Sequence, residues 1–153
     1  MKLTEDVIHF FQGQGFVIIS TIDKNGYPHN SCKGIIEITN DGKVYLLDVY
    51  RARTHENLIN NPHVSISMVN EHKFSGYCLK GKAKVMPPEE MKPDIIKAWE
   101  DRITSRLTQR LLKNMLEQKG HPRHPEAMLP KPQYLIVIDV EEVVNLTPQH
   151  LKQ

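Results

Sequence analysis

The segment 77–85 shows the clearest alternation of apolar and polar positions along the chain. Apolar or small residues occupy its odd positions, and a cysteine and three lysines occupy the even ones. A period of two is typical of a strand with one buried face. Residues 64–68 alternate in the same way, while residues 16–23 and 135–140 are continuous apolar, β-branched runs that also predict strands.

Two tight-turn sequences predict two further strands. Lys24-Asn25-Gly26 follows the first apolar run, and Asn40-Asp41-Gly42 comes 16 positions later in the numbering. Asn-Gly suits backbone positions that need positive φ, and Asn40-Asp41-Gly42 has the composition of a second tight turn. We therefore expect strands at residues 28–39 and 44–49, joined to the first strand as an antiparallel meander.

Three segments have helical patterns. Residues 3–12 are amphipathic, with Thr4 as a candidate cap and glycines after the end, and residues 54–61 form a short helix that stops before Pro62. A longer helix is predicted at 94–119, with apolar groups at helical spacing, which indicates packing against the barrel or a partner subunit. These groups are Ile95, Trp99, Ile103, Leu107, Leu111 and Met115.

The order of elements indicates the fold class. A helix and three strands are followed by a short helix, two strands, a long helix and a final strand. Short antiparallel strands at this spacing favour a mainly β small barrel over a parallel sheet. We expect a single domain over residues 1–153, in which residues 88–133 form a helical and Pro-rich insertion.

Composition excludes several classes of function. Twenty basic and 18 acidic residues give a net charge of +2, which does not favour nucleic acid or an anionic membrane as a partner. No apolar run is long enough to span a bilayer, and the first residues do not resemble a signal peptide. With only two cysteines, the chain is expected to be cytoplasmic. It contains no Walker loop, dinucleotide Gly-rich turn or Ser-His-Asp set.

Residues 51–54 carry the strongest candidate chemistry. Arg51, Arg53 and Thr54 directly follow the strand predicted at 44–49 and begin a helix. A helix N-terminus has free backbone N–H groups and partial positive charge, and two guanidinium groups beside it would hold a phosphate. The alternatives are that the arginines are solvated loop charges and that Thr54 is only an N-cap, a role compatible with phosphate binding.

Several segments, taken in order, resemble one known family. They are Val17 to Pro28 with its turn, Asp41 to Leu46, the run Arg51-Ala-Arg-Thr54 with Asn57-Leu58 and Asn61-Pro62, and Gly81-Lys82-Ala83. This pattern resembles the FMN-binding split barrels of the pyridoxamine 5′-phosphate oxidase superfamily over residues 5–87, with a weaker likeness at 134–146. The resemblance implies a six-stranded antiparallel split β-barrel of Greek-key type with flanking helices.

The resemblance also implies a cofactor, a site and an assembly. Arg51, Arg53 and Thr54 would hold the phosphate of FMN. The isoalloxazine ring would lie against a second group of residues, namely Asn30, Ser31, Cys32, Lys33, Asp48 and Val49. Family members are usually homodimers with two flavins at the interface, so the expected partners are FMN, a small-molecule redox partner and a second copy of the chain.

The chain departs from the true oxidases in its C-terminal part. The segment that binds pyridoxal phosphate has no recognisable counterpart, so oxidation of pyridoxamine phosphate is not expected. The predicted function is a flavin-dependent oxidoreductase with unassigned catalytic residues and substrate. The alternatives are a non-enzymatic flavin electron carrier and a relative that binds a deazaflavin or haem. The eight histidines are a weak argument for haem binding. His121 and His124 have a spacing that could hold a metal ion, but the neighbouring prolines favour a surface loop.

Overall fold

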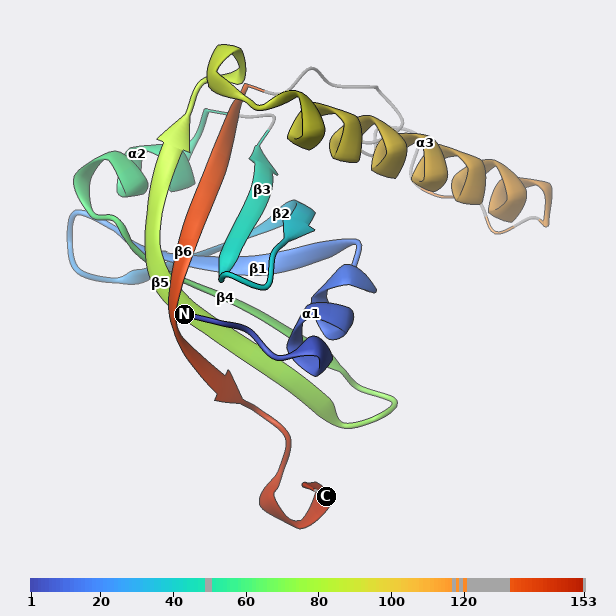
Figure 1. Cartoon of the computed structure of the whole chain (residues 1–153), viewed down its shortest axis with the longest axis horizontal. Helices are drawn as coiled ribbons and strands as arrows, with labels where there is room; N and C mark the ends of the chain where they lie inside the picture. The colour runs from blue at the N-terminus through green and yellow to red at the C-terminus, as the bar shows by residue number, and fades with distance from the viewer. Residues whose placement is uncertain (49–50, 117, 119, 121–132, 153) are drawn as a thin grey trace.

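The structure is a computed structural model that describes residues 1–48, 51–116, 118, 120 and 133–152 (Figure 1). Six strands and three α-helices form the main elements. In chain order they are α1 (Glu5–Gln12), β1 (Phe16–Ile22), β2 (Pro28–Ile38), β3 (Lys43–Asp48), α2 (Arg53–Asn60), β4 (His63–Asn70), β5 (Ser75–Met86), α3 (Pro93–Met115) and β6 (Tyr134–Asn145). Short 3-10 helices lie at Pro88–Glu90 and Gln149–Leu151.

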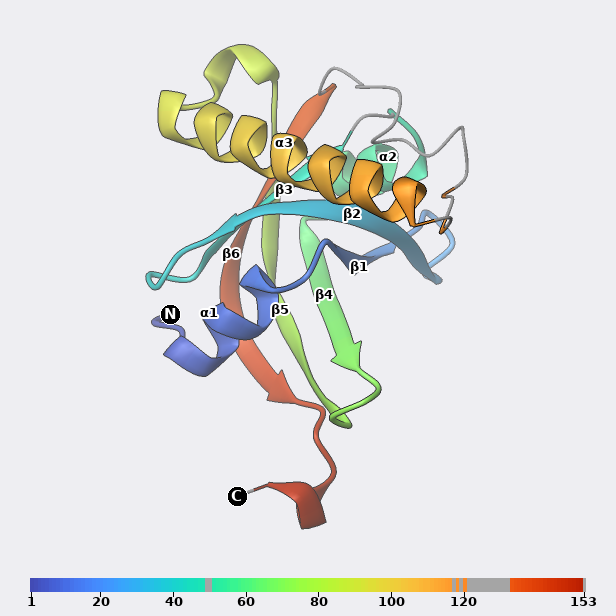
Figure 2. The ribbon, with the colours of Figure 1, turned by 90° about the vertical axis from the view of Figure 1, so that its right-hand side faces the viewer.

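The six strands form a closed antiparallel barrel with the order β1-β2-β3-β6-β5-β4 (Figures 1 and 2). The chain therefore does not lay its strands down in spatial order, because β6 inserts between β3 and β5. The mainly β architecture with flanking helices confirms the predicted fold class. The Pro-rich stretch at 121–132 lies outside the described residues.

The barrel interior contains the inward-facing residues of every strand. Val17, Ile19, Leu46 and Ile66 are completely buried there, and Phe11 of α1 joins them. Side chains of a strand alternate between faces, so the apolar positions of the period-two pattern meet inside the barrel. This core fixes the orientation of the outward-facing side chains as well.

Both predicted hairpin turns are present. Gly26 has φ of 84° and Gly42 has φ of 90°, the left-handed conformation that favours glycine. One carboxylate oxygen of Asp23 accepts hydrogen bonds from the backbone N–H groups of Asn25, at 2.8 Å, and Tyr27, at 2.9 Å. These bonds explain why the first turn closes between β1 and β2.

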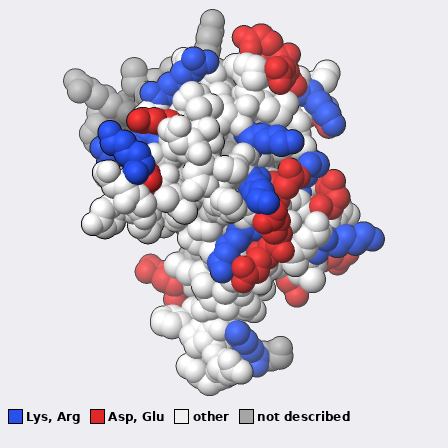
Figure 3. Space-filling model, turned by 90° about the vertical axis from the view of Figure 1, so that its left-hand side faces the viewer, with Lys and Arg blue, Asp and Glu red and all other residues white. Residues whose placement is uncertain are grey.

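Strand β6 continues past its apolar run, still paired with β5, and charges on β5 pair with its polar end. Lys80 Nζ lies 3.1 Å from Glu142 Oε2, and Lys82 Nζ lies 3.5 Å from Glu141 Oε1. Figure 3, viewed from the side of β5 and α2, shows acidic and basic side chains next to each other. These lysines lie on a solvated sheet face with acidic neighbours.

A β-bulge at Gly81 shifts the register between these strands. Lys80 is opposite Glu142, whereas Gly81 is opposite Val140. A Cβ atom on Gly81 would lie 2.0 Å from the backbone carbonyl oxygen of Asp139, so no larger residue fits without moving the backbone.

Helix α3 packs on the barrel through its first half only. Ile95 is buried together with Ile36 and Leu135, and Trp99 packs against this cluster. In contrast, Leu111 and Met115 are 63% and 74% exposed. The apolar groups expected along the whole helix therefore pack on the barrel at its first half, whereas Leu111 and Met115 near its end are exposed.

Arg102 anchors α3 over β2. Its Nη2 donates to the carbonyl oxygens of Gln12, at 2.9 Å, and Gln14, at 2.8 Å, and its Nη1 donates to those of Ile35 and Ile36. Burial lowers the pKa of Arg102, and the nearby charge of Arg106 lowers it further. A guanidinium with this many fixed donors holds the helix in one position across β2 (Figure 2).

Candidate functional site

The start of α2 has no capping side chain. The helix begins at Arg53, and its N-cap residue is Ala52, which makes no side-chain cap. Thr54 is buried inside the first turn, so the expectation that it is the N-cap is wrong. Without a capping side chain, the first backbone N–H groups of α2 remain suited to an anion, and Arg51 and Arg53 are exposed beside them.

Two buried contacts position this helix against the barrel. The hydroxyl oxygens of Ser31 on β2 and Thr54 lie 2.7 Å apart. Asn57 Nδ2 donates to Thr21 Oγ1 on β1 at 3.0 Å, and both side chains are buried. Asn57 thus packs α2 against β1, and the Ser31–Thr54 contact places the start of α2 beside β2.

A buried ion pair lies between β2 and β3. Lys33 Nζ is 2.6 Å from Asp48 Oδ2, and the two side chains are only 10% and 2% exposed. The hydroxyl of Tyr134, at the start of β6, donates to the same carboxylate oxygen. The ring of His55 on α2 meets the Tyr134 ring edge to face at a centroid distance of 4.7 Å. The cluster therefore connects α2, β2, β3 and β6.

Tyr134 is held in its neutral form. Burial raises the pKa of its hydroxyl strongly, and the hydrogen bond to Asp48 and the charge of Asp48 raise it further. The charge of Arg51 acts in the opposite direction, which shows that this arginine lies within electrostatic reach of the cluster.

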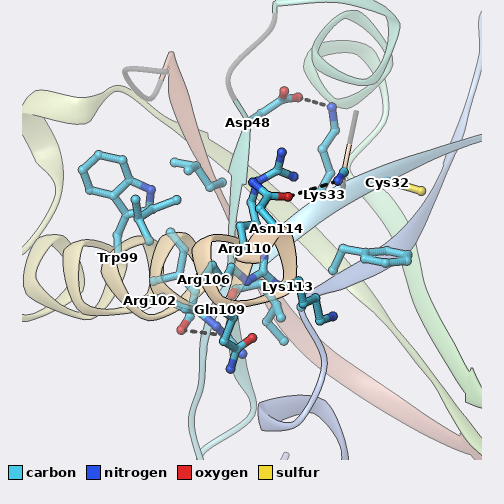
Figure 4. A pocket seen from close by; sticks show the side chains of 18 of the residues that line it. Cys32, Lys33, Asp48, Trp99, Arg102, Arg106, Gln109, Arg110, Lys113 and Asn114 are labelled. Carbon is cyan, nitrogen blue, oxygen red and sulfur yellow. Dashed lines mark hydrogen bonds and ion pairs between the residues drawn. The ribbon is translucent and has the colours of Figure 1, made fainter. Parts of the chain in front are cut away.

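Strand geometry divides residues 30–33 between two faces of β2. Ser31 and Lys33 point toward α2 and Asp48, whereas Asn30 and Cys32 are exposed on the other face. Figure 4 shows Lys33 reaching toward Asp48 and Cys32 pointing away from them. Asn30 Oδ1 accepts a hydrogen bond from Ser20 Oγ at 2.6 Å. Val49 lies outside the described residues.

A cavity of about 730 Å³ adjoins this cluster, between α3 and the strands β2 and β3. Cys32, Lys33 and Asp48 line one side of it, and α3 supplies the opposite side (Figure 4). Small-molecule sites in proteins commonly have volumes of 300–1,000 Å³. Neither Arg51 nor Arg53 is among the residues that line the cavity.

The sequence pattern did not identify every member of this region. Tyr134 lies one residue before the strand predicted at 135–140, and the sequence pattern gives it no role in the site. The lining that α3 contributes comes from a helix that the pattern indicates only as a packing element. In the described ranges no group of three or more His, Cys, Asp or Glu residues is arranged for a metal ion, and His121 and His124 lie outside those ranges. None of the described helices has the length and apolar character needed to cross a membrane.

Comparison with known proteins defines the family. The sequence profile described as pyridoxamine 5'-phosphate oxidase matches residues 3–146. Group A Streptococcus HupZ superposes with a TM-score of 0.63 at 18% identity, covering 95% of this chain and 94% of that one. General Stress Protein 26 from Bacillus anthracis gives a TM-score of 0.57 at 18% identity, with 95% and 94% coverage.

An F420 reductase superposes with a TM-score of 0.58 at 12% identity, covering 93% of this chain and 98% of that one. A search of curated proteins found no match. The solved structures share the fold with this chain, and the sequence profile extends over nearly its whole length. The chain therefore belongs to the pyridoxamine 5'-phosphate oxidase family.

Proposed function

We propose that the protein binds FMN and acts as a flavin-dependent oxidoreductase on a small molecule. The observation that carries the proposal is the uncapped start of α2, with Arg51, Arg53 and the Ser31–Thr54 hydroxyl pair beside it. A phosphate with near double negative charge needs this combination of N–H donors, guanidinium groups and hydroxyls. These residues fit the phosphate of a flavin mononucleotide.

The isoalloxazine ring would lie along β2 and the end of β3, near Lys33, Asp48 and Cys32, with Asn30 and Val49 at its margins. The flavin supplies the ability to accept and pass on electrons. The chain binds and orients the ring. The cavity beside these residues offers space for a reaction partner.

A homodimer is part of the same proposal. Phe16, Ile18 and Ile22 on the outer face of β1 are 47%, 38% and 39% exposed, although outer sheet faces are normally polar. Phe16 also lines the cavity, so a second copy packed on β1 would lie next to the proposed ring site. Light scattering coupled to gel filtration would report twice the mass of 17.7 kDa.

Absorption spectra test the cofactor directly. The purified protein, mixed with FMN and passed through gel filtration, should retain the visible bands of oxidised flavin. Arg53→Ala should weaken FMN binding by about 1–3 kcal/mol, since a charged hydrogen bond to phosphate is lost. Lys73→Ala, in the β4–β5 turn far from α2 (Figure 1), is the matched control and should leave affinity unchanged. Unchanged affinity in a folded Arg51→Ala/Arg53→Ala variant would refute the phosphate site.

A deazaflavin coenzyme is the second candidate, because the fold is shared with an F420 reductase. Equilibrium binding of FMN and of the deazaflavin to the same preparation would rank the two. Addition of haem, with a search for a Soret band, tests the remaining alternative. Oxidation of NAD(P)H at enzymatic rates by the flavin-loaded protein would exclude a simple electron carrier.

A further inference from the structure

The cavity beneath α3 has an unusual charge balance for a nearly neutral chain. Its described lining includes five basic side chains and one acidic one, Asp48, which is paired with Lys33. The basic residues are Lys33, Arg102, Arg106, Arg110 and Lys113. The whole chain has a net charge of only +2, so the described lining of this cavity is more basic than the chain as a whole.

Helix geometry explains the concentration. Arg102, Arg106, Arg110 and Lys113 recur every three or four residues and therefore share one face of α3. Arg102 uses its donors on backbone carbonyls and fixes the helix. The next three cations along that face line the cavity (Figure 4).

The backbone of Gly15 helps to position the nearest of these cations. A Cβ atom on Gly15 would lie 2.1 Å from Nη2 of Arg106, so the guanidinium occupies the space that a side chain there would fill. Gly15 and Arg106 both line the cavity, at the turn between α1 and β1. The guanidinium therefore lies against the barrel surface at the edge of the hollow.

Apolar groups complete the lining. Phe16 and Leu47 come from the barrel, and Trp99 and Ile103 come from α3. A ligand that uses both kinds of lining needs an apolar body for these side chains and a negative group for the arginines. The cavity volume of about 730 Å³ is large enough for a molecule of this kind.

We propose that this cavity binds a small organic anion with an apolar, planar body, whose carboxylate, sulfonate or phosphate group is held by Arg106, Arg110 and Lys113. Because Cys32, Lys33 and Asp48 border the same cavity, the anion is the small molecule that reacts with the flavin, a role that rests on the proposed function. Binding of the anion itself requires only the residues of the cavity.

A pair of fluorescent probes tests the charge requirement on the full chain. The anionic probe is 8-anilinonaphthalene-1-sulfonate, and N-phenyl-1-naphthylamine is its neutral counterpart. Arg106→Gln/Arg110→Gln should raise the Kd of the anionic probe at least tenfold and change that of the neutral probe less than twofold. The control Lys80→Gln/Lys82→Gln removes two charges from the outer face of the barrel and should change neither.

Equal affinity of the anionic probe for wild type and the arginine variant would overturn the proposal, as would a parallel loss of the neutral probe. If the arginine variant fails to fold, Lys113→Gln at an exposed position of α3 replaces it, with an expected loss of about threefold. Unchanged binding of the anionic probe to that variant would equally contradict the proposal.

Repeating the titration with saturating FMN separates the two proposals. Arginine-dependent binding of the anionic probe by a protein that ignores FMN would refute the proposed function and leave the anion site standing. Tight FMN binding, together with an affinity for the anionic probe that does not depend on Arg106 and Arg110, would refute the anion site and leave the proposed function standing. Competition between FMN and the anionic probe, with both lost in the arginine variant, would assign the cavity to the flavin and overturn the separate anion site.

Discussion

Replacing Lys33 or Asp48, the partners of the buried ion pair, should lower the free energy of unfolding by different amounts. With 2.6 Å between Nζ and Oδ2, the attraction is about 6 kcal/mol at an effective dielectric constant of about 20. The cost of removing both charges from water offsets most of it. Lys33→Met removes the Lys33 ammonium from the carboxylate of Asp48, which is only 2% exposed, so we expect a loss of about 3–5 kcal/mol in unfolding free energy.

Removing the carboxylate should cost less. Lys33 retains 10% exposure beside the cavity, and its long flexible side chain can bring the ammonium group to water. In Asp48→Asn the amide oxygen still accepts from the Tyr134 hydroxyl. We therefore expect a loss of about 1–2 kcal/mol for Asp48→Asn, mainly from the weakened hydrogen bonds.

Urea unfolding of the flavin-free protein, followed by circular dichroism, would measure both losses and that of the double variant. Since the partners share one interaction, the double variant should be more stable than the sum of the single losses predicts, by about 2 kcal/mol. Lys82→Met, whose partner Glu141 is exposed, should change stability by less than about 0.5 kcal/mol. Additive losses, or equal losses for the two single variants, would refute the reasoning.

Two other substitutions test features of the barrel. Gly81→Ala places a Cβ 2.0 Å from the carbonyl oxygen of Asp139 and should destabilise the fold by on the order of 2–4 kcal/mol. Gly34→Ala on β2 places a Cβ that meets nothing within 4 Å, and it should be neutral or slightly stabilising. Similar melting temperatures for the two variants would contradict this. Tyr134 has a raised pKa in the folded state, so the stability that its neutral form contributes is complete below the unfolded pKa of about 10 and is lost as pH rises above it. Tyr134→Phe should therefore unfold with a shallower pH dependence above pH ~10 in urea titrations, and identical slopes for variant and wild type would exclude this role.

The strands could be predicted where local signals were strong. Asn25-Gly26 and Asp41-Gly42 have the turn chemistry that positive φ requires, and both turns form where expected. The end of β6 was missed because Glu141 and Glu142 carry no apolar signal. They belong to the strand because β6 stays paired with β5 beyond Val140. Glu142 lies opposite Lys80, and Lys82 forms an ion pair with Glu141 at the register shift, contacts that only the closed barrel brings about.

The candidate site was predictable only in part for a similar reason. The arginines and Thr54 are adjacent in sequence, so a local motif could indicate them. Tyr134 reaches Asp48 from a strand 86 residues away along the chain, and Arg102 reaches Ile36 across 66. Contacts of this range depend on how α3 and β6 dock, which no short pattern specifies.

The position of β6 within the barrel has a consequence for biosynthesis. Lys43 of β3 and Asp139 of β6 are paired although 96 residues separate them along the chain. Until β6 emerges from the ribosome, β3 and β5 both present open edges, and the apolar interior faces solvent. The first three strands can form a local meander early, but closure has to wait until nearly all of these residues have been translated. Nascent chains of this protein should therefore depend on chaperone protection until late in synthesis.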